Sequence, residues 1–245
     1  MVEVETQPPV VEEEKSLLNG LLGAMKIGSI ENQDGDSPFY IACRDGNLKV
    51  VKELLTYPNV DVNQRKQDLS TPFSIACEKK RYGVINELLK DPRVDVNCQR
   101  EDGSTPFLLS CVEGNFDIVK ILQKNHRINV NKSKYDGSTP FLLACGQGNI
   151  EIVKQLLLDS RLDVNCSQLN GITPIFISLL NGHISIAKWI LASGRSINLK
   201  SEWKSQTLFQ LVEQKGNQEF LELIKSYDDQ SFFFFFFFFF FFFFF

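Results

Sequence analysis

One motif recurs along this chain every 34 residues, and this period constrains the fold more than any other feature. The marker of each copy is a Ser-Pro or Thr-Pro pair, and a sixth copy keeps the threonine without the proline. The marker residues are Ser37, Thr71, Thr105, Thr139, Thr173 and Thr207. A period of about 20–50 residues is typical of stacked supersecondary units, each of which packs on its neighbours. The sequence therefore predicts a repeat protein.

The fourth copy indicates what one unit folds into. Pro140 suits the first turn of a helix, and the threonine before it can cap that helix. Gly148 is expected to end the helix in the left-handed conformation that side chains resist. A second helix is expected from Ile150 to about Leu158, because apolar residues recur there at helical spacing. The extended segment that follows should lead to a hairpin-type turn at residues 170–171.

At these residues the chain resembles the ankyrin-repeat family, whose consensus runs G-x-T-P-L-H-x-A, then G-H or G-N, then V-x-x-L-L and A-x-V-N. The resemblance covers roughly residues 34–225, with a unit one residue longer than the usual 33, of the kind seen in protist members. It implies an all-α solenoid of helix-turn-helix units with β-hairpin loops. The consensus histidine, which joins a hydrogen-bond network between hairpin and helix in the family, is absent, so we expect a different polar network here. Its place is taken by Tyr40, Ser74, Leu108, Leu142 and Phe176.

Five full repeats and a degenerate C-terminal capping repeat are expected over residues 34–228. Residues 1–14 are rich in proline and glutamate and lack a secretory signal, so they are predicted to be a disordered acidic tail. Residues 15–33 are predicted to form a capping helix, with a membrane or partner helix as the alternative. Fourteen consecutive phenylalanines, Phe232–Phe245, are shorter than the ~18–20 apolar residues that span a bilayer. We interpret residues 229–245 as a gene-model artefact, with a tail anchor or a degradation signal as alternatives.

Repeat two departs from the pattern at Lys80, where the other copies have glycine. A side chain in a left-handed position costs on the order of 1 kcal/mol, so this turn is expected to be weaker or differently shaped. Lys80 also belongs to the densest basic cluster, residues 79–81, which we interpret as solvated surface or as a contact for an acidic partner.

Composition and spacing give no support for a catalytic or metal site. The net charge is −4, and five glutamates of the N-terminal tail supply negative charge, so the repeats carry no electrostatic signature of a nucleic-acid or anionic-membrane partner. The two histidines fall at repeat-defined positions and are too few for a metal site. Four cysteines recur in one small-residue position and are expected to be buried, whereas Cys98 and Cys166 are expected on hairpins, where they could be exposed and reactive. The four are Cys43, Cys77, Cys111 and Cys145. No cofactor is expected.

An asparagine also recurs once per unit after the second helix. Two of the four copies match the N-glycosylation pattern, but we interpret the whole set as turn-forming residues. The resemblance implies that an oxygenase can hydroxylate such an asparagine. The set is Asn63, Asn97, Asn131 and Asn165.

What varies between the copies is the surface of the hairpin tips and of the exposed ends of the first helices. The resemblance implies that these parts form a concave face on which protein partners bind. The predicted tip residues are Lys66, Gln67, Arg100, Glu101, Lys134, Tyr135, Gln168, Leu169 and Trp203. The predicted helix-end residues are Arg44, Asp45, Glu78, Lys79, Val112, Glu113 and Gln147.

We therefore predict a non-catalytic scaffold for protein–protein interaction, monomeric and cytoplasmic, with no nucleic acid partner. No membrane partner is expected unless the phenylalanine run is genuine, in which case the chain would be a membrane-tethered adaptor. The alternative is a regulatory or targeting arm of a larger signalling enzyme, such as a kinase or a ubiquitin ligase.

Overall fold

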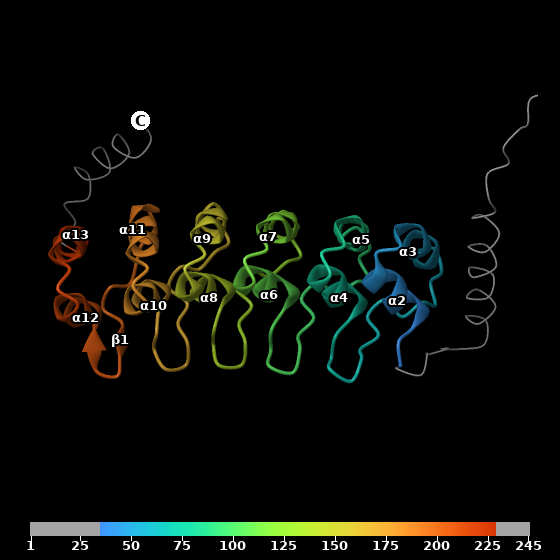
Figure 1. Cartoon of the computed structure of the whole chain (residues 1–245), viewed down its shortest axis with the longest axis horizontal. Coiled ribbons are helices and arrows are strands. Elements are labelled where there is room, and N and C mark those ends of the chain that lie inside the picture. Colours follow the sequence, from blue (N-terminus) through green and yellow to red (C-terminus); the bar gives the residue numbers. More distant parts are fainter. Residues whose placement is uncertain (1–34, 229–245) are drawn as a thin grey trace, which may run out of the picture. The chain divides into compact units, whose positions relative to one another are not determined.

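A computed structural model describes residues 35–228, and it contains the predicted pairs of helices joined by projecting loops (Figure 1). The predicted acidic tail, the predicted capping helix and the phenylalanine run lie outside the described residues. The chain divides into two compact units, whose described parts are residues 35–95 and 96–228.

The first unit holds repeats one and two. The first helices of the two repeats pack on each other, and so do the second helices. Phe39 and Phe73, 34 residues apart, are each 1% exposed and fill equivalent places in its core. The helices are α2 (Pro38–Asp45), α3 (Leu48–Leu55), α4 (Pro72–Glu78) and α5 (Tyr82–Leu88).

The second unit holds repeats three to six, again with contacts between successive first helices and between successive second helices. Its last helix buries Phe220, Leu221 and Ile224 and exposes Glu219 and Glu222, the polar outer side expected of a terminal repeat. Its helices are α6 (Pro106–Val112), α7 (Phe116–Gln123), α8 (Pro140–Gln147), α9 (Ile150–Leu157), α10 (Pro174–Leu180), α11 (Ile184–Ala192), α12 (Leu208–Gln214) and α13 (Gln218–Asp228), and its strands are β1 (Glu202–Trp203) and β2 (Gln206–Thr207).

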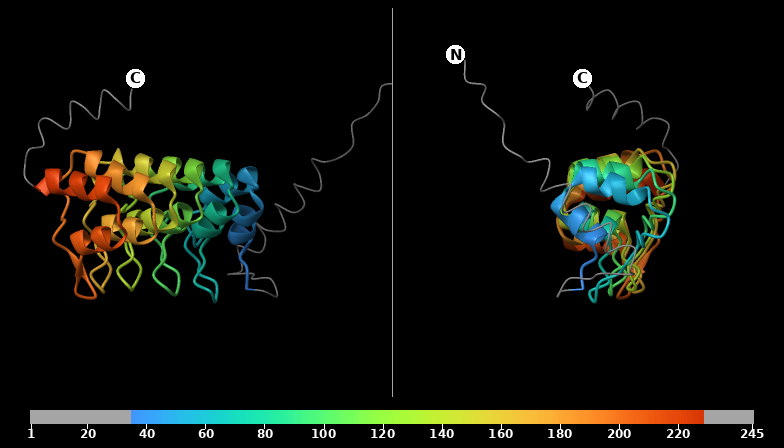
Figure 2. Two further views of the ribbon diagram at one scale, coloured as in Figure 1. Left: turned by 60° about the vertical axis from the view of Figure 1, so that its left-hand side comes forward. Right: turned by 90° about the vertical axis from the view of Figure 1, so that its right-hand side faces the viewer.

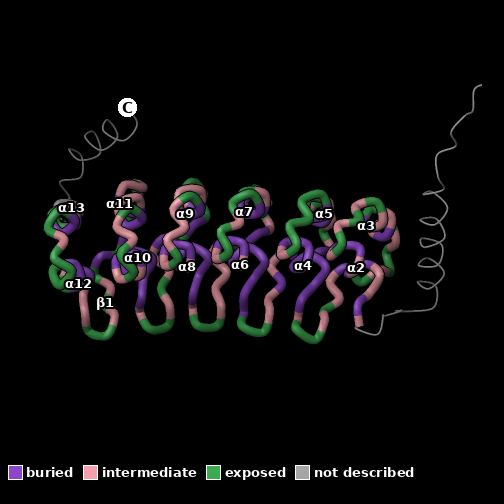
Figure 3. Tube along the Cα trace, viewed as in Figure 1, coloured by how far each residue is buried: buried purple, intermediate pink, exposed green. Residues whose placement is uncertain are grey.

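Within each unit the first helices form one layer and the second helices another, and the loops project beyond the first-helix layer (Figures 1 and 2). Burial follows the layers, because the first helices are mostly buried whereas the loop tips are exposed (Figure 3).

The threonine of each marker pair caps the helix that follows, as predicted, with one exception. The Oγ1 atoms of Thr105 and Thr139 each accept the backbone N–H three residues later at 3.2 Å. Thr207 caps α12 even without the proline, through a capping box with Gln210. Thr173 makes no such bond, and its hydroxyl lies 3.2 Å from the Ser201 hydroxyl instead.

The predicted left-handed residues are confirmed between the helices of each repeat. Gly148 has φ +79°, and Lys80 adopts the same region at φ +56° although it carries a side chain. Repeat two has a second such residue, Leu69 at φ +59°, where the loops of later repeats have Gly103, Gly137 and Gly171. The equivalent position of the sixth copy, Ser205, is also a residue other than glycine and has φ +59°.

The loops have the shape of hairpins, but among the described residues only β1 and β2 pair as regular antiparallel strands. The tip of the loop between α9 and α10 shows how the others close. The Gln168 N–H donates to the Ile172 carbonyl, and the Gly171 N–H donates back to the Gln168 carbonyl, both at 2.9 Å. Asn170 fixes the turn by accepting the Ile172 N–H through its side chain.

The positions that replace the consensus histidine differ between the units. In the first unit the Tyr40 hydroxyl lies 3.0 Å from the Ser70 hydroxyl, which links helix to loop. In the second unit Leu108, Leu142 and Phe176 are at most 1% exposed and make apolar contacts only. The expectation of a changed polar network is therefore met, since packing replaces the hydrogen bonds in the longer unit.

Candidate functional site: the loop tips and first-helix ends

The predicted tip residues form two rows, because each tip contributes two consecutive residues that face differently. The inner row is half-buried, and the outer row is exposed except at Trp203. The inner row is Lys66 in the first unit and Arg100, Lys134 and Gln168 in the second. The outer row is Gln67 in the first unit and Glu101, Tyr135, Leu169 and Trp203 in the second.

Inner-row side chains are used to hold successive loops together. Lys66 Nζ lies 2.6 Å from a carboxylate oxygen of Asp36, and Lys134 Nζ lies 2.7 Å from one of Asp102. Gln168 Nε2 donates to the Ser138 hydroxyl at 2.6 Å. These predicted partner-binding residues are therefore largely engaged within the protein, which limits what they can offer to a partner.

The ion pair of Asp102 changes the titration of its carboxylate. Burial alone would raise the pKa of Asp102, but the hydrogen bonds from Lys134 and Ser104 outweigh it and lower the pKa to about 2. In the first unit the hydrogen bond to Asp36 raises the pKa of Lys66. These shifts favour the charged forms of Asp102 and of Lys66.

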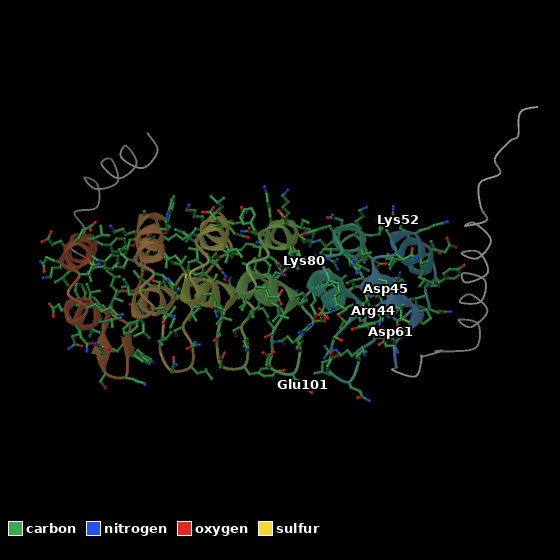
Figure 4. All side chains as sticks on the ribbon, in the orientation of Figure 1. Arg44, Asp45, Lys52, Asp61, Lys80 and Glu101 are labelled. Carbon is green, nitrogen blue, oxygen red and sulfur yellow. The ribbon has the colours of Figure 1, made fainter. Side chains whose placement is uncertain are left out.

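Three of the four outer-row residues of the second unit, Tyr135, Leu169 and Trp203, form an apolar row at successive loop tips. Tyr135 is 67% exposed and Leu169 is 83% exposed. Trp203 is half-buried because its ring packs edge-to-face on Phe176, with 6.0 Å between ring centroids. Glu101 stands at the corresponding tip one repeat earlier, at the outer end of its loop (Figure 4).

The predicted helix-end residues differ in character between the units. In the first unit they are charged and pair locally: Arg44 binds Asp45 at 2.9 Å and the buried Asp36 at 3.0 Å. Glu78 and Lys79 likewise pair at 3.0 Å. Arg44 and Asp45 lie at the end of α2 in Figure 4. Because Asp36 also binds Lys66, one buried carboxylate brings a helix-end residue and a tip residue together.

In the second unit the accessible faces of the first helices are less charged. Val112 is half-buried, and Glu113 and Gln147 are exposed, with Glu113 accepting a hydrogen bond from Asn115 at 2.7 Å. Other half-buried positions on these helices are apolar, among them Leu109, Leu143, Ile177 and Leu180. The predicted surface therefore has a charged part in the first unit and a mainly apolar part in the second.

The recurring asparagines bridge neighbouring repeats, a role that goes beyond the predicted turn. Asn131 Nδ2 donates to the Arg161 carbonyl at 2.7 Å, and its Oδ1 accepts the Asp163 N–H at 2.9 Å. Asn63 makes the same two bonds to residues 93 and 95, and Asn97 makes them to residues 127 and 129.

A row of arginines that the sequence reasoning missed stabilises the ends of the second helices. Arg161 donates to the carbonyls of Gln123, Asn125 and Ile128 in the preceding repeat and is held by Asp159 at 2.7 Å. Arg93 and Arg195 reach the equivalent carbonyls of their own preceding repeats. Their spacing was the available signal, since arginine recurs every 34 residues at 93, 127, 161 and 195.

The basic cluster of repeat two is only partly available to a partner. Arg81 Nε donates to the Arg44 carbonyl at 2.8 Å, so this side chain caps the end of α2. Lys79 and Lys80 are exposed.

The cysteines are mostly core residues. The four that share one repeat position are at most 3% exposed, as predicted, and burial raises the pKa of the Cys43, Cys111 and Cys145 thiols. Cys98 is also buried, which corrects the expectation that it could be exposed. Cys166 is half-buried, and burial together with the hydrogen bond to Asp163 raises its pKa to about 12. A raised pKa disfavours the thiolate, the reactive form.

The described part of the chain has neither a metal-binding cluster nor a membrane-spanning helix. Residues 35–228 contain no group of three or more His, Cys, Asp or Glu side chains that could hold a metal ion. Among the helices of the same range, none is both long enough and apolar enough to cross a membrane.

Comparison with known proteins gives the family. No curated protein matches the chain. An ankyrin repeat domain from Acinetobacter baumannii, solved at 1.00 Å resolution, superposes with a TM-score of 0.69 at 19% identity and covers 78% of this chain and 97% of its own. The family model for ankyrin repeats (3 copies) matches residues 11–100, 74–168, 111–201 and 142–231. Repeats of this kind are in general protein–protein interaction modules. The chain belongs to the ankyrin-repeat family.

Proposed function

We propose that this protein is a non-catalytic scaffold that binds a protein partner through its loop tips and the adjoining ends of its first helices. The observation that carries the proposal is the exposure of Tyr135 and Leu169, at equivalent tips of successive repeats. Large apolar side chains in neighbouring exposed positions are typical of interaction sites. Tyrosine and tryptophan are also favoured at the energetic centres of interfaces.

The charged residues of the predicted set contribute less to partner binding, in this proposal, than the exposed apolar residues. Lys66 and Lys134 are held by carboxylates of their own chain, so replacing them would change loop packing as well as any contact with a partner. Tyr135 and Leu169 are better residues to alter, because removal of an exposed side chain leaves the core intact.

The experiment is affinity capture from the native cell lysate with three full-length baits. The first is the natural chain, the second carries Tyr135→Ser and Leu169→Ser, and the third carries Leu158→Ser. Leu158 is a matched control, because it is 79% exposed at the end of a second helix, away from the loop tips. We expect a protein that the natural chain and the control retain and the double variant loses. Equal retention by all three baits would refute the proposed site.

We also propose that the protein is a monomer and that it is not an arm of a larger enzyme. We propose the cytoplasm as the compartment, tested by imaging a tagged full chain. Sedimentation of the purified chain tests the monomer. The alternative, an arm of a larger signalling enzyme, is separated from the scaffold by the transcript sequence across Ser231.

A further inference from the structure

Three apolar side chains, Tyr135, Leu169 and Trp203, occupy successive loop tips of the second unit and differ from Glu101 at the tip before them. The inference below rests on the proposed function and concerns the kind of segment that this row binds. Its evidence is the spacing of the row, the chemistry of its side chains and the charge beside them.

The spacing of the row follows from the packing of the repeats. Successive first helices of the second unit contact each other, and packed helices lie about 8–10 Å apart. Neighbouring loops are also hydrogen-bonded to each other, so the loop tips follow the stacking of the repeats. The Tyr135 N–H donates to the Asp102 carbonyl at 3.3 Å, and the Leu169 N–H donates to the Asp136 carbonyl at 3.0 Å.

A bound peptide would have to place side chains on one face at this interval, and regular peptide conformations differ in that spacing. A polyproline II segment has three residues per turn and rises 3.1 Å per residue, so every third side chain lies on one face at intervals of about 9.3 Å. On one face of a β-strand, side chains two or four residues apart are separated by about 6.7 Å or 13.4 Å. On an α-helix, side chains seven residues apart are separated by about 10.5 Å. This separation exceeds the interval between tips, and the mismatch grows over three tips. Polyproline II is the conformation that fits within the range.

The side chains of the row suit the same conformation. Two of the three are aromatic, and proline-rich segments dock between aromatic side chains, which contact the flat proline rings. Trp203 is held in place by its contact with Phe176, so little side-chain freedom is lost when a ligand packs on it.

Charge beside the row indicates what should flank such a segment. Three exposed carboxylates lie next to the row, at Glu101, Asp136 and Glu202, and none of them forms an ion pair within the part of the chain that the structure describes. The exposed lysine among these tips, Lys204, lies over the Trp203 ring, with 4.5 Å from its Nζ to the ring centroid. This excess of exposed carboxylates favours basic residues in the ligand.

We infer that the loop tips of the second unit bind a proline-rich segment of a protein partner in the polyproline II conformation, with an apolar residue at every third position and lysine or arginine at its ends. Tyr135, Leu169 and Trp203 form the two slots that hold the segment. The neighbouring carboxylates attract its basic ends.

The test uses the full chain with Trp189→Phe, so that Trp203 is its one tryptophan. The probe is a synthetic peptide of repeated Leu-Pro-Pro triplets with two lysines at each end. One matched peptide has glutamates at the ends, and a second has the same leucines and lysines at heptad spacing in a helical sequence. Binding is followed by the fluorescence of Trp203 and by calorimetry.

The lysine-ended triplet peptide is expected to bind best and to change Trp203 fluorescence. Tyr135→Ser with Leu169→Ser should weaken it about tenfold or more, whereas Leu158→Ser should leave it unchanged. Circular dichroism and the urea midpoint of both variants, which alter exposed residues only, check that they are folded.

Tighter binding of the helical peptide, lost in the double variant, would overturn this inference while leaving the proposed function in place. Equal binding of the glutamate-ended peptide would overturn the part assigned to the carboxylates. Self-association of the free chain that the double variant abolishes would assign the row to a second copy instead. If no peptide binds and lysate capture is also unaffected by the double variant, both the inference and the proposed function fail.

Discussion

Replacement of Asn131 by alanine should destabilise the second unit, because this side chain joins repeats three and four by two hydrogen bonds. It donates to the Arg161 carbonyl at 2.7 Å and accepts the Asp163 N–H at 2.9 Å. A typical intramolecular hydrogen bond contributes about 0.5–1.5 kcal/mol net. Loss of two such bonds at a half-buried position should lower the free energy of unfolding by about 1–2 kcal/mol.

Urea denaturation followed by tryptophan fluorescence measures this change directly, because both tryptophans, Trp189 and Trp203, lie in the second unit. With a urea dependence of about 1–3 kcal/mol per molar, the midpoint should fall by roughly 0.3–2 M. Asn131→Asp should also be destabilised, since it keeps the acceptor but sets a second oxygen against the Arg161 carbonyl.

Asn129 in the same loop supplies the matched control, because its side-chain oxygen accepts the Asn131 N–H within one repeat. Asn129→Ala should therefore cost less than Asn131→Ala. The reasoning is refuted if the free energy of unfolding of Asn131→Ala lies within about 0.3 kcal/mol of that of the natural chain. It is also refuted if Asn129→Ala is less stable than Asn131→Ala.

Three further predictions concern strain, pH and thiol reactivity. Lys80→Gly should stabilise the first unit by about 0.5–1 kcal/mol, because φ +56° strains a side chain, and a fall in thermal midpoint would contradict this. The carboxylate of Asp102, with a pKa of about 2 against an ordinary 3.8, should stabilise the fold above pH 4 and lose that contribution as pH falls towards 2. Lys134→Ala should raise the pKa of Asp102 in a carbon-13 NMR titration, and an unchanged pKa would argue against the ion pair. Cys166 should react slowly with iodoacetamide at pH 8, because its pKa is about 12, and Asp163→Ala should speed the reaction by removing the hydrogen-bonded carboxylate.

Much of the fold could be predicted because the same local sequence signals recur in every repeat. The capping threonines, the proline at the first helical turn and the left-handed glycine act within a few residues, and each recurs at a known distance. At Lys80 the sequence left open a weaker turn or a differently shaped one, and the structure shows the same left-handed conformation as at the glycines.

Local signals did not reveal which tip residues face outward. Lys134 and Tyr135 are consecutive and were predicted alike, yet one turns back to Asp102 and the other is exposed. That difference depends on how far each residue lies along its loop and on contacts with the neighbouring repeat. The 34-residue spacing specifies neither. The recurrence of the bridging asparagines and arginines is visible in the sequence, but their role is not, since their partners are backbone carbonyls and amides, which leave no mark on the sequence.

Site-specific photocrosslinking in the native cell tests the central claim most directly. A photoreactive phenylalanine analogue is placed at position 135, on the loop tips, or at position 158, which is as accessible but lies at the end of a second helix. The account predicts a discrete crosslinked protein partner from position 135 and none from position 158. A partner crosslinked only from position 158, or equally from both, would contradict it.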